Sequence, residues 1–179
     1  MPFLATNSFR TPTKTLNKSL EHNFVELLEE HQNIVHKVCR LYTNDQASHK
    51  DLFQEITIQL WKAYPKFRGD SKFSTWMYRV ALNTAITLYR KSTRKIKTQE
   101  FDTVQFKIKT EEYDQTEEVQ LKLMYQAIHE LNDIEKALVL LYLEDKNYSE
   151  ISDTLGISEV NARVKMNRVK KKLKTILNP

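Results

Sequence analysis

The chain has 179 residues, 40% of them hydrophobic, and a formal net charge of +5 at pH 7. Only two glycines and four prolines are present, which argues against an all-β protein with many tight turns and favours helices. The single cysteine excludes an intramolecular disulfide and a zinc site built from neighbouring cysteines. No run of 18 apolar residues occurs, so we expect a cytoplasmic protein without membrane insertion of its own.

The first half of the chain is predicted to hold three helices. Residues 1–19 are polar and basic without a single acid, and we expect a disordered tail there. Apolar residues at helical spacing then predict a helix from about residue 20 to 41, with Cys39 on its buried side. A second helix is predicted over residues 51–64, ended by Pro65, and a third from about 73 to 94. Residues 66–72 between them are expected to form a loop.

The charge changes sign in the middle of the chain. Residues 62–97 contain ten basic side chains and one acidic side chain, whereas residues 99–118 contain seven acids and two lysines. The stretch 96–116 has no steady apolar period, so it is expected to be a flexible acidic linker. A basic region on each side of it is typical of two nucleic-acid-facing modules, although a charge run is more often simply a solvated face.

The last third is predicted to form four helices, over residues 119–130, 133–144, 148–155 and 158–177. Gly156 supplies the left-handed backbone that ends the third of these, and Ser158 can cap the fourth. A short helix, a glycine turn and a longer capped helix together predict a helix-turn-helix, whose second helix enters the major groove of DNA. An ordinary helical hairpin is the alternative, but the dense basic residues on the exposed face favour DNA.

The last helix divides into an inward and an outward face. Its apolar stripe steps by four, three, four and three residues through Ala162, Met166, Val169, Leu173 and Ile176. Arginine reads guanine and asparagine reads adenine, each through paired hydrogen bonds. Val164 packs either on a thymine methyl or, as an apolar filler, against Tyr148 or Ile157. The predicted DNA-facing residues are Asn161, Arg163, Val164, Asn167 and Arg168.

Two further groups in the first half have the chemistry of binding sites. Asp51, Gln54 and Glu55 share one face of the second helix, where a solvated face is the plainer interpretation. The loop and the third helix bring together aromatic rings and cations, which trap unpaired bases by stacking and phosphate contact. Most of these aromatics are expected in the core, with one of Trp76 and Tyr78 buried and the other partly exposed. Phosphate contacts are predicted for Arg79, Arg90, Lys91 and Arg94.

Both halves of the chain resemble one family. Residues 148–159, with Arg163, Lys165 and Arg168, resemble the promoter-recognising region 4 of bacterial sigma factors. Independently, the stretches DLFQEI, LW, FRGDS and FSTWMYRVALNTAI, between residues 51 and 86, resemble region 2. The acidic linker without a middle domain is that of the extracytoplasmic-function (ECF) group. The resemblance implies an all-α protein with region 2 at 20–95, the linker at 96–116 and region 4, the helix-turn-helix domain, at 117–179.

The resemblance also implies partners and roles. Core RNA polymerase would bind Asp51, Gln54 and Glu55, an anti-sigma factor would hold the protein inactive, and the linker would thread toward the polymerase active site. Val160 and Val164 depart from the glycine and serine more usual in the family, which implies a different minus-35 preference. The minus-10 element of the promoter DNA would be melted and read by Phe67, Arg68, Lys72, Trp76, Arg79, Asn83 and Arg90, and the minus-35 element by the five DNA-facing residues of the last helix.

Two alternatives stay open on the sequence alone. A free-standing helix-turn-helix regulator would bind duplex DNA as a dimer, and a helical interaction module would present its basic faces to an acidic partner. Catalysis has no support, because the five histidines lack metal-ligand spacing and no phosphate-binding glycine loop or nucleophile elbow occurs. No enzyme activity, metal or cofactor is therefore expected.

Overall fold

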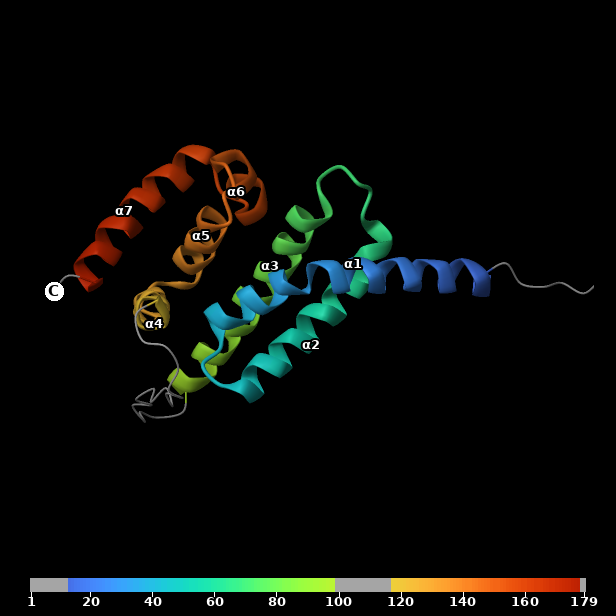
Figure 1. Ribbon diagram of the computed structural model, residues 1–179, viewed down its shortest axis with the longest axis horizontal. Coiled ribbons are helices and arrows are strands. Elements are labelled where there is room, and N and C mark those ends of the chain that lie inside the picture. Colours follow the sequence, from blue (N-terminus) through green and yellow to red (C-terminus); the bar gives the residue numbers. More distant parts are fainter. Residues whose placement is uncertain (1–12, 99–116, 178–179) are drawn as a thin grey trace, which may run out of the picture.

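A computed structural model describes residues 13–98 and 117–177, and every regular element in these ranges is helical (Figure 1). The predicted all-α fold is confirmed. Helix α1 begins earlier than predicted, so residues 13–19 of the expected tail are helical, while residues 1–12 and 99–116 lie outside the described ranges. The elements are α1 (Thr13–Tyr42), α2 (Gln46–Ala63), the 3₁₀ turn η1 (Tyr64–Lys66), α3 (Phe73–Thr98), α4 (Glu117–His129), α5 (Asp133–Leu143), α6 (Tyr148–Leu155) and α7 (Glu159–Leu177).

Helices α1, α2 and α3 pack against one another as a bundle (Figure 1). Burial of apolar side chains such as Ile56, Leu60 and Met77 stabilises it. Helix α2 starts five residues before the predicted position because Asp45 caps it, accepting a hydrogen bond from the Ser48 amide at 2.8 Å. Residues 46–50, which lie outside the predicted helix, form its capped first turn.

Helices α4 to α7 form the second group. Asn132 and Asn147 each close a capping box with the glutamate three residues later, so α5 and α6 have fixed starting points. Gly156 has φ +66°, and its amide donates to the Ser152 carbonyl at 2.9 Å. The Ser158 hydroxyl accepts from the Asn161 amide at 3.2 Å, which caps α7. The predicted left-handed glycine and the predicted cap are both confirmed.

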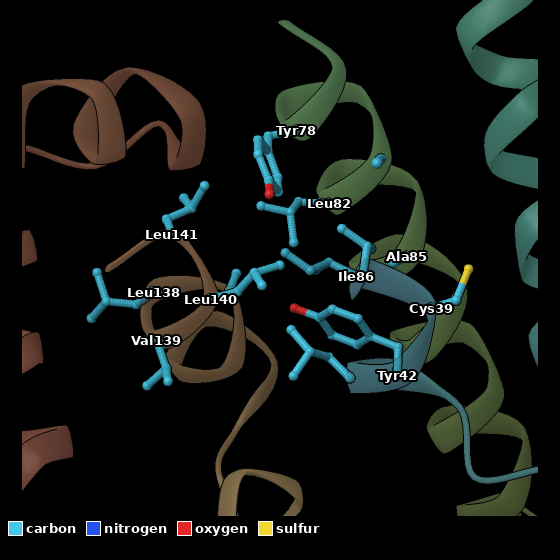
Figure 2. Packing of buried hydrophobic residues seen from close by; sticks show 14 of the residues in the cluster. Cys39, Tyr42, Tyr78, Leu82, Ala85, Ile86, Leu138, Val139, Leu140 and Leu141 are labelled. Carbon is cyan, nitrogen blue, oxygen red and sulfur yellow. The ribbon is translucent and has the colours of Figure 1, made fainter. Parts of the chain in front are cut away.

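The two groups of helices share one hydrophobic core (Figure 2). Helix α5 is buried from residue 136 to residue 141, because α6 and α7 cover one side of it and α1 and α3 contact the other. Figure 2 shows Leu140 of α5 opposite Tyr42 of α1 and Leu82 and Ile86 of α3, while Leu138 points away from them on the other side of α5. The continuous core arises because α5 is apolar on more than one face.

Polar contacts border this interface. Lys37 on α1 donates to Glu144 at 2.6 Å, and Arg90 on α3 forms an ion pair with Asp133 at the start of α5. The Tyr42 hydroxyl donates to the Asp133 carbonyl at 2.6 Å. Burial, followed by the Asp133 carboxylate, raises the pKa of Tyr42, so this phenol stays protonated and remains a donor. Each of these contacts joins residues at least 91 positions apart, except the Arg90 pair, which spans 43.

The single cysteine occupies the expected place. Cys39 is fully buried on α1, and burial raises the pKa of its thiol to about 12. A thiol with so high a pKa has almost no thiolate at neutral pH, so it is chemically inert. The predicted burial of Cys39 is confirmed.

Candidate nucleic-acid interface

Helix α7 presents the predicted inward and outward faces. Ala162, Met166 and Val169 are buried, and they seat the helix on the rest of its half. The side chains on the outward face of α7 are exposed, among them all five predicted DNA-facing residues: Asn161, Arg163, Val164, Asn167 and Arg168.

Arg163 is held by two neighbours. Its Nη2 donates to Glu159 Oε1 at 2.6 Å, one helical turn earlier, and its guanidinium lies 4.7 Å from the centre of the Tyr148 ring on α6. The spacing of four residues could have indicated the pair with Glu159. The contact with Tyr148 crosses the turn between two helices, so no sequence period reveals it.

Two valines stand on the same outward face. Val160 is 72% exposed and Val164 is 43% exposed, whereas the core valine of this helix, Val169, is 1% exposed. An apolar filler loses most of its contact with water, because removal from water is the source of its stabilisation. Val164 is therefore accessible on the outward face of α7.

The basic end of α7 makes contacts within the protein. Lys170 donates to the Tyr142 hydroxyl at 2.8 Å and lies 4.1 Å from the centre of that ring. Lys172 donates to the Glu130 carbonyl at 3.3 Å and to the Glu135 carboxylate at 3.4 Å. These two lysines link α7 to α5 and to Glu130, the residue that follows α4. Both lysine side chains nevertheless remain exposed.

Aromatic side chains cluster around η1 and the start of α3. The rings of Phe67 and Trp76 lie 5.1 Å apart, and Phe73 contacts both. Trp76 is half-buried and Tyr78 is 2% exposed, so the expectation that one of the two is core and the other accessible is confirmed. Phe67 is half-buried as well. The neighbouring cations Arg68 and Lys72 are exposed.

The predicted DNA-binding residues of α3 divide into two sets. Arg79 and Asn83 are exposed and lie four residues apart, on one face of the helix. Arg90 lies further along the same helix, and its guanidinium is paired with Asp133 of α5. Arg90 was predicted as a phosphate contact. In this structure it joins the two halves of the chain, a placement that depends on a residue 43 positions away.

The carboxylate face of α2 is also accessible. Asp51 and Gln54 are exposed, and Glu55 is half-buried and accepts a hydrogen bond from Gln59 at 2.7 Å. Asp51 and Glu55 line one side of a groove whose other side includes Tyr89 and Lys91 of α3. An exposed carboxylate pair beside a groove can receive cationic side chains of a partner.

Among the residues that the structure describes, no group of three or more histidine, cysteine, aspartate or glutamate side chains is arranged to hold a metal ion. Within the described ranges, no helix is both long enough and apolar enough to cross a membrane.

A helical bundle joined to a helix-turn-helix, with arginine and asparagine side chains exposed on the last helix, is typical of DNA-binding transcription proteins. The chain matches sigma-70 region 2 over residues 27–95 and sigma-70 region 4 over residues 121–173. It therefore belongs to the sigma-70 family, and within that family it is an ECF sigma factor. Sigma factors of this family bind core RNA polymerase and promoter DNA and direct promoter-specific transcription initiation, so this chain is a transcription initiation factor.

Curated relatives and solved structures agree with this assignment. The chain is 29% identical over 136 residues to the RNA polymerase sigma factor SigZ of Bacillus subtilis, covering 75% of each chain. It is 26% identical over 155 residues to the ECF sigma factor SigM of the same species, covering 86% of this chain and 94% of SigM. Its fold is similar to that of the sigma factor RpoE in complex with the anti-sigma factor NepR from Bartonella quintana. That likeness has a TM-score of 0.70 at 16% identity and covers 87% of this chain and 96% of RpoE.

Proposed function

We propose that this ECF sigma factor uses three separate surfaces, one to bind polymerase and two to recognise promoter DNA. The carboxylate face of α2 binds core polymerase, the loop at residues 67–72 with α3 melts and reads the minus-10 element, and the first half of α7 reads the minus-35 element. The observation that carries the proposal is the outward face of α7, which exposes arginine and asparagine side chains above a fully buried stripe. Such side chains make paired hydrogen bonds with base edges in the major groove.

Binding to core polymerase involves Asp51, Gln54 and Glu55. Their side chains are accessible beside the groove between α2 and α3, where arginine or lysine side chains of a partner can enter. A carboxylate that pairs with arginine in a partly desolvated interface makes strong, directional hydrogen bonds. The groove thus provides both the charge and the shape for docking.

Melting and reading of the minus-10 element require a place for unpaired bases. The half-buried rings of Phe67 and Trp76 offer stacking surfaces, and they are held in position by Phe73. Arg68, Lys72 and Arg79 supply cations around them, and Asn83 reads a base edge. Arg90 joins this set when its pair with Asp133 opens.

The remaining assignments rest on the family. Region 2 spans residues 20–95 and region 4 spans residues 117–179, with the acidic linker of residues 96–116 directed toward the polymerase active site. The protein acts in the cytoplasm, has no catalytic activity of its own, and is held inactive by an anti-sigma factor. The solved complexes of RpoE with NepR and of CnrH with the cytosolic domain of CnrY support such a partner.

The proposal is tested by comparing the chain with and without polymerase. We expect the purified protein to co-elute with bacterial core RNA polymerase in gel filtration, and to retard genomic DNA fragments in a gel shift only when polymerase is present. Mapping of transcript starts in vitro then gives its promoters. Specific retardation by the chain alone, without polymerase association, would indicate a free-standing regulator and would end the roles given to α2.

Val164 is expected to contact a thymine methyl in the minus-35 element. Replacing that thymine by uracil removes only the methyl, which should weaken promoter binding by the holoenzyme by about 0.8 kcal/mol, roughly fourfold. The variant Val164→Ser should bind the thymine and uracil promoters equally well. Competition binding with each thymine replaced in turn measures this. Equal sensitivity of the native protein and the variant at every position would contradict the contact.

A further inference from the structure

The guanidinium of Arg163 lies between two groups that belong to different helices. Tyr148 is the first residue of α6, and its ring centre is 4.7 Å from the guanidinium carbon. Glu159, in the first turn of α7, accepts from Nη2 at 2.6 Å. The arginine side chain is nevertheless 58% exposed, so part of it stays free to meet a ligand.

Tyr148 is itself firmly placed. Its ring is half-buried and packs against the hydrophobic core, and Asn147 directly before it closes the capping box that fixes the start of α6. A tyrosine has only two side-chain torsions, whereas an arginine side chain loses much rotational freedom when it is immobilised. A fixed ring beneath a guanidinium plane therefore restrains a side chain that would otherwise sample many orientations.

The orientation of the guanidinium matters because arginine recognises guanine with two N–H groups at once. Two parallel N–H groups of an arginine must meet the O6 and N7 atoms of guanine together, and this needs the guanidinium plane at one angle. Contact with an aromatic face restrains the plane and leaves the N–H groups at its edge available. The carboxylate of Glu159 takes one of these donors and so selects which edge faces outward.

We propose that Tyr148 is a positioning residue for promoter recognition, whose ring holds Arg163 in the orientation that reads guanine in the minus-35 element. Glu159 completes the arrangement by accepting from Nη2. The inference rests on the proposed function of α7. Side chains from both helices of the helix-turn-helix thereby take part in recognising one guanine, although only Arg163 touches the base.

The test combines a ring-preserving and a ring-removing substitution with a promoter that lacks one acceptor. Replacing a guanine by 7-deazaguanine removes N7 alone, and each guanine of the minus-35 element is replaced in turn. Arg163→Ala identifies the guanine that Arg163 reads, because at that position 7-deazaguanine no longer lowers the affinity of this variant for the promoter. We expect Tyr148→Leu to weaken binding of the native promoter about three- to tenfold, since the freed side chain must be ordered on binding.

Two matched comparisons separate positioning from folding. Tyr148→Phe keeps the ring face, so it should retain the full penalty for 7-deazaguanine, whereas Tyr148→Leu should lose most of it. In the double variant Tyr148→Leu/Arg163→Ala, the loss should not exceed that of Arg163→Ala. Core-polymerase binding and the thermal unfolding midpoint are measured for every variant.

Three results would overturn the proposal. If Tyr148→Leu still distinguishes guanine from 7-deazaguanine as well as the native protein does, the ring contact does not position Arg163. Equal losses in the phenylalanine and leucine variants, with lower unfolding midpoints, would show a structural role only. If Arg163→Ala leaves the loss of affinity caused by 7-deazaguanine unchanged at every guanine, Arg163 does not read a guanine N7. This result would refute the role of Arg163 in the proposed function, and the positioning role of Tyr148 with it.

Discussion

Replacing Asp51 and Glu55 together by alanine is expected to abolish co-elution with core RNA polymerase. Each carboxylate that pairs with a cation in a desolvated interface leaves that cation unpaired when it is removed, at a cost of about 2–5 kcal/mol. A loss of about 2 kcal/mol already raises Kd by roughly thirtyfold. The change should appear in the dissociation rate, which surface-bound polymerase in a biosensor measures directly.

The fold should tolerate this substitution. Asp51 is exposed, and Glu55 accepts a hydrogen bond from Gln59 on the same helix. Alanine is also a better helix former than either acid. The control is Asp153→Ala, which removes an exposed carboxylate of α6. Native-like binding by the double variant, together with an unchanged circular dichroism spectrum, would show that polymerase binds elsewhere on the chain.

Reversing the charge of Asp133 is expected to separate the two groups of helices. In Asp133→Arg, the ion pair with Arg90 becomes a repulsion at the edge of the shared core. The Asp133 side chain is only 17% exposed, so we expect a cost of ~1–3 kcal/mol, more than for a fully solvated pair. Small-angle X-ray scattering of the free protein should then show a larger radius of gyration.

A charge swap provides the matched control. Arg90→Asp combined with Asp133→Arg restores an ion pair of opposite polarity, and it should restore much of the compact radius. If Asp133→Arg alone leaves the radius unchanged, the apolar contacts around Tyr42 and Leu140 suffice to hold the halves together. Because Arg90 occupies this pair, contact between Arg90 and DNA phosphate requires the pair to open.

The local features of the chain were readable from its sequence. Gly156 was identified because only a left-handed turn explains a glycine between two helical periods, and Ser158 because a hydroxyl ahead of a helix satisfies a free amide. The inward stripe of α7 followed from the helical period alone. The first turn of α2 was missed, although the signal was present in Asp45 and Ser48.

The sequence by itself determined the helices, the helix-turn-helix and the side chains that α7 and α2 expose, because these depend on periodicity and on backbone angles within a few residues. Only the tertiary structure decided the continuous core around α5, the pairing of Arg90 with Asp133 and the placement of Tyr148 beneath Arg163. The physical reason is distance along the chain. Contacts between helices depend on how whole apolar faces pack, and no local pattern records which faces meet.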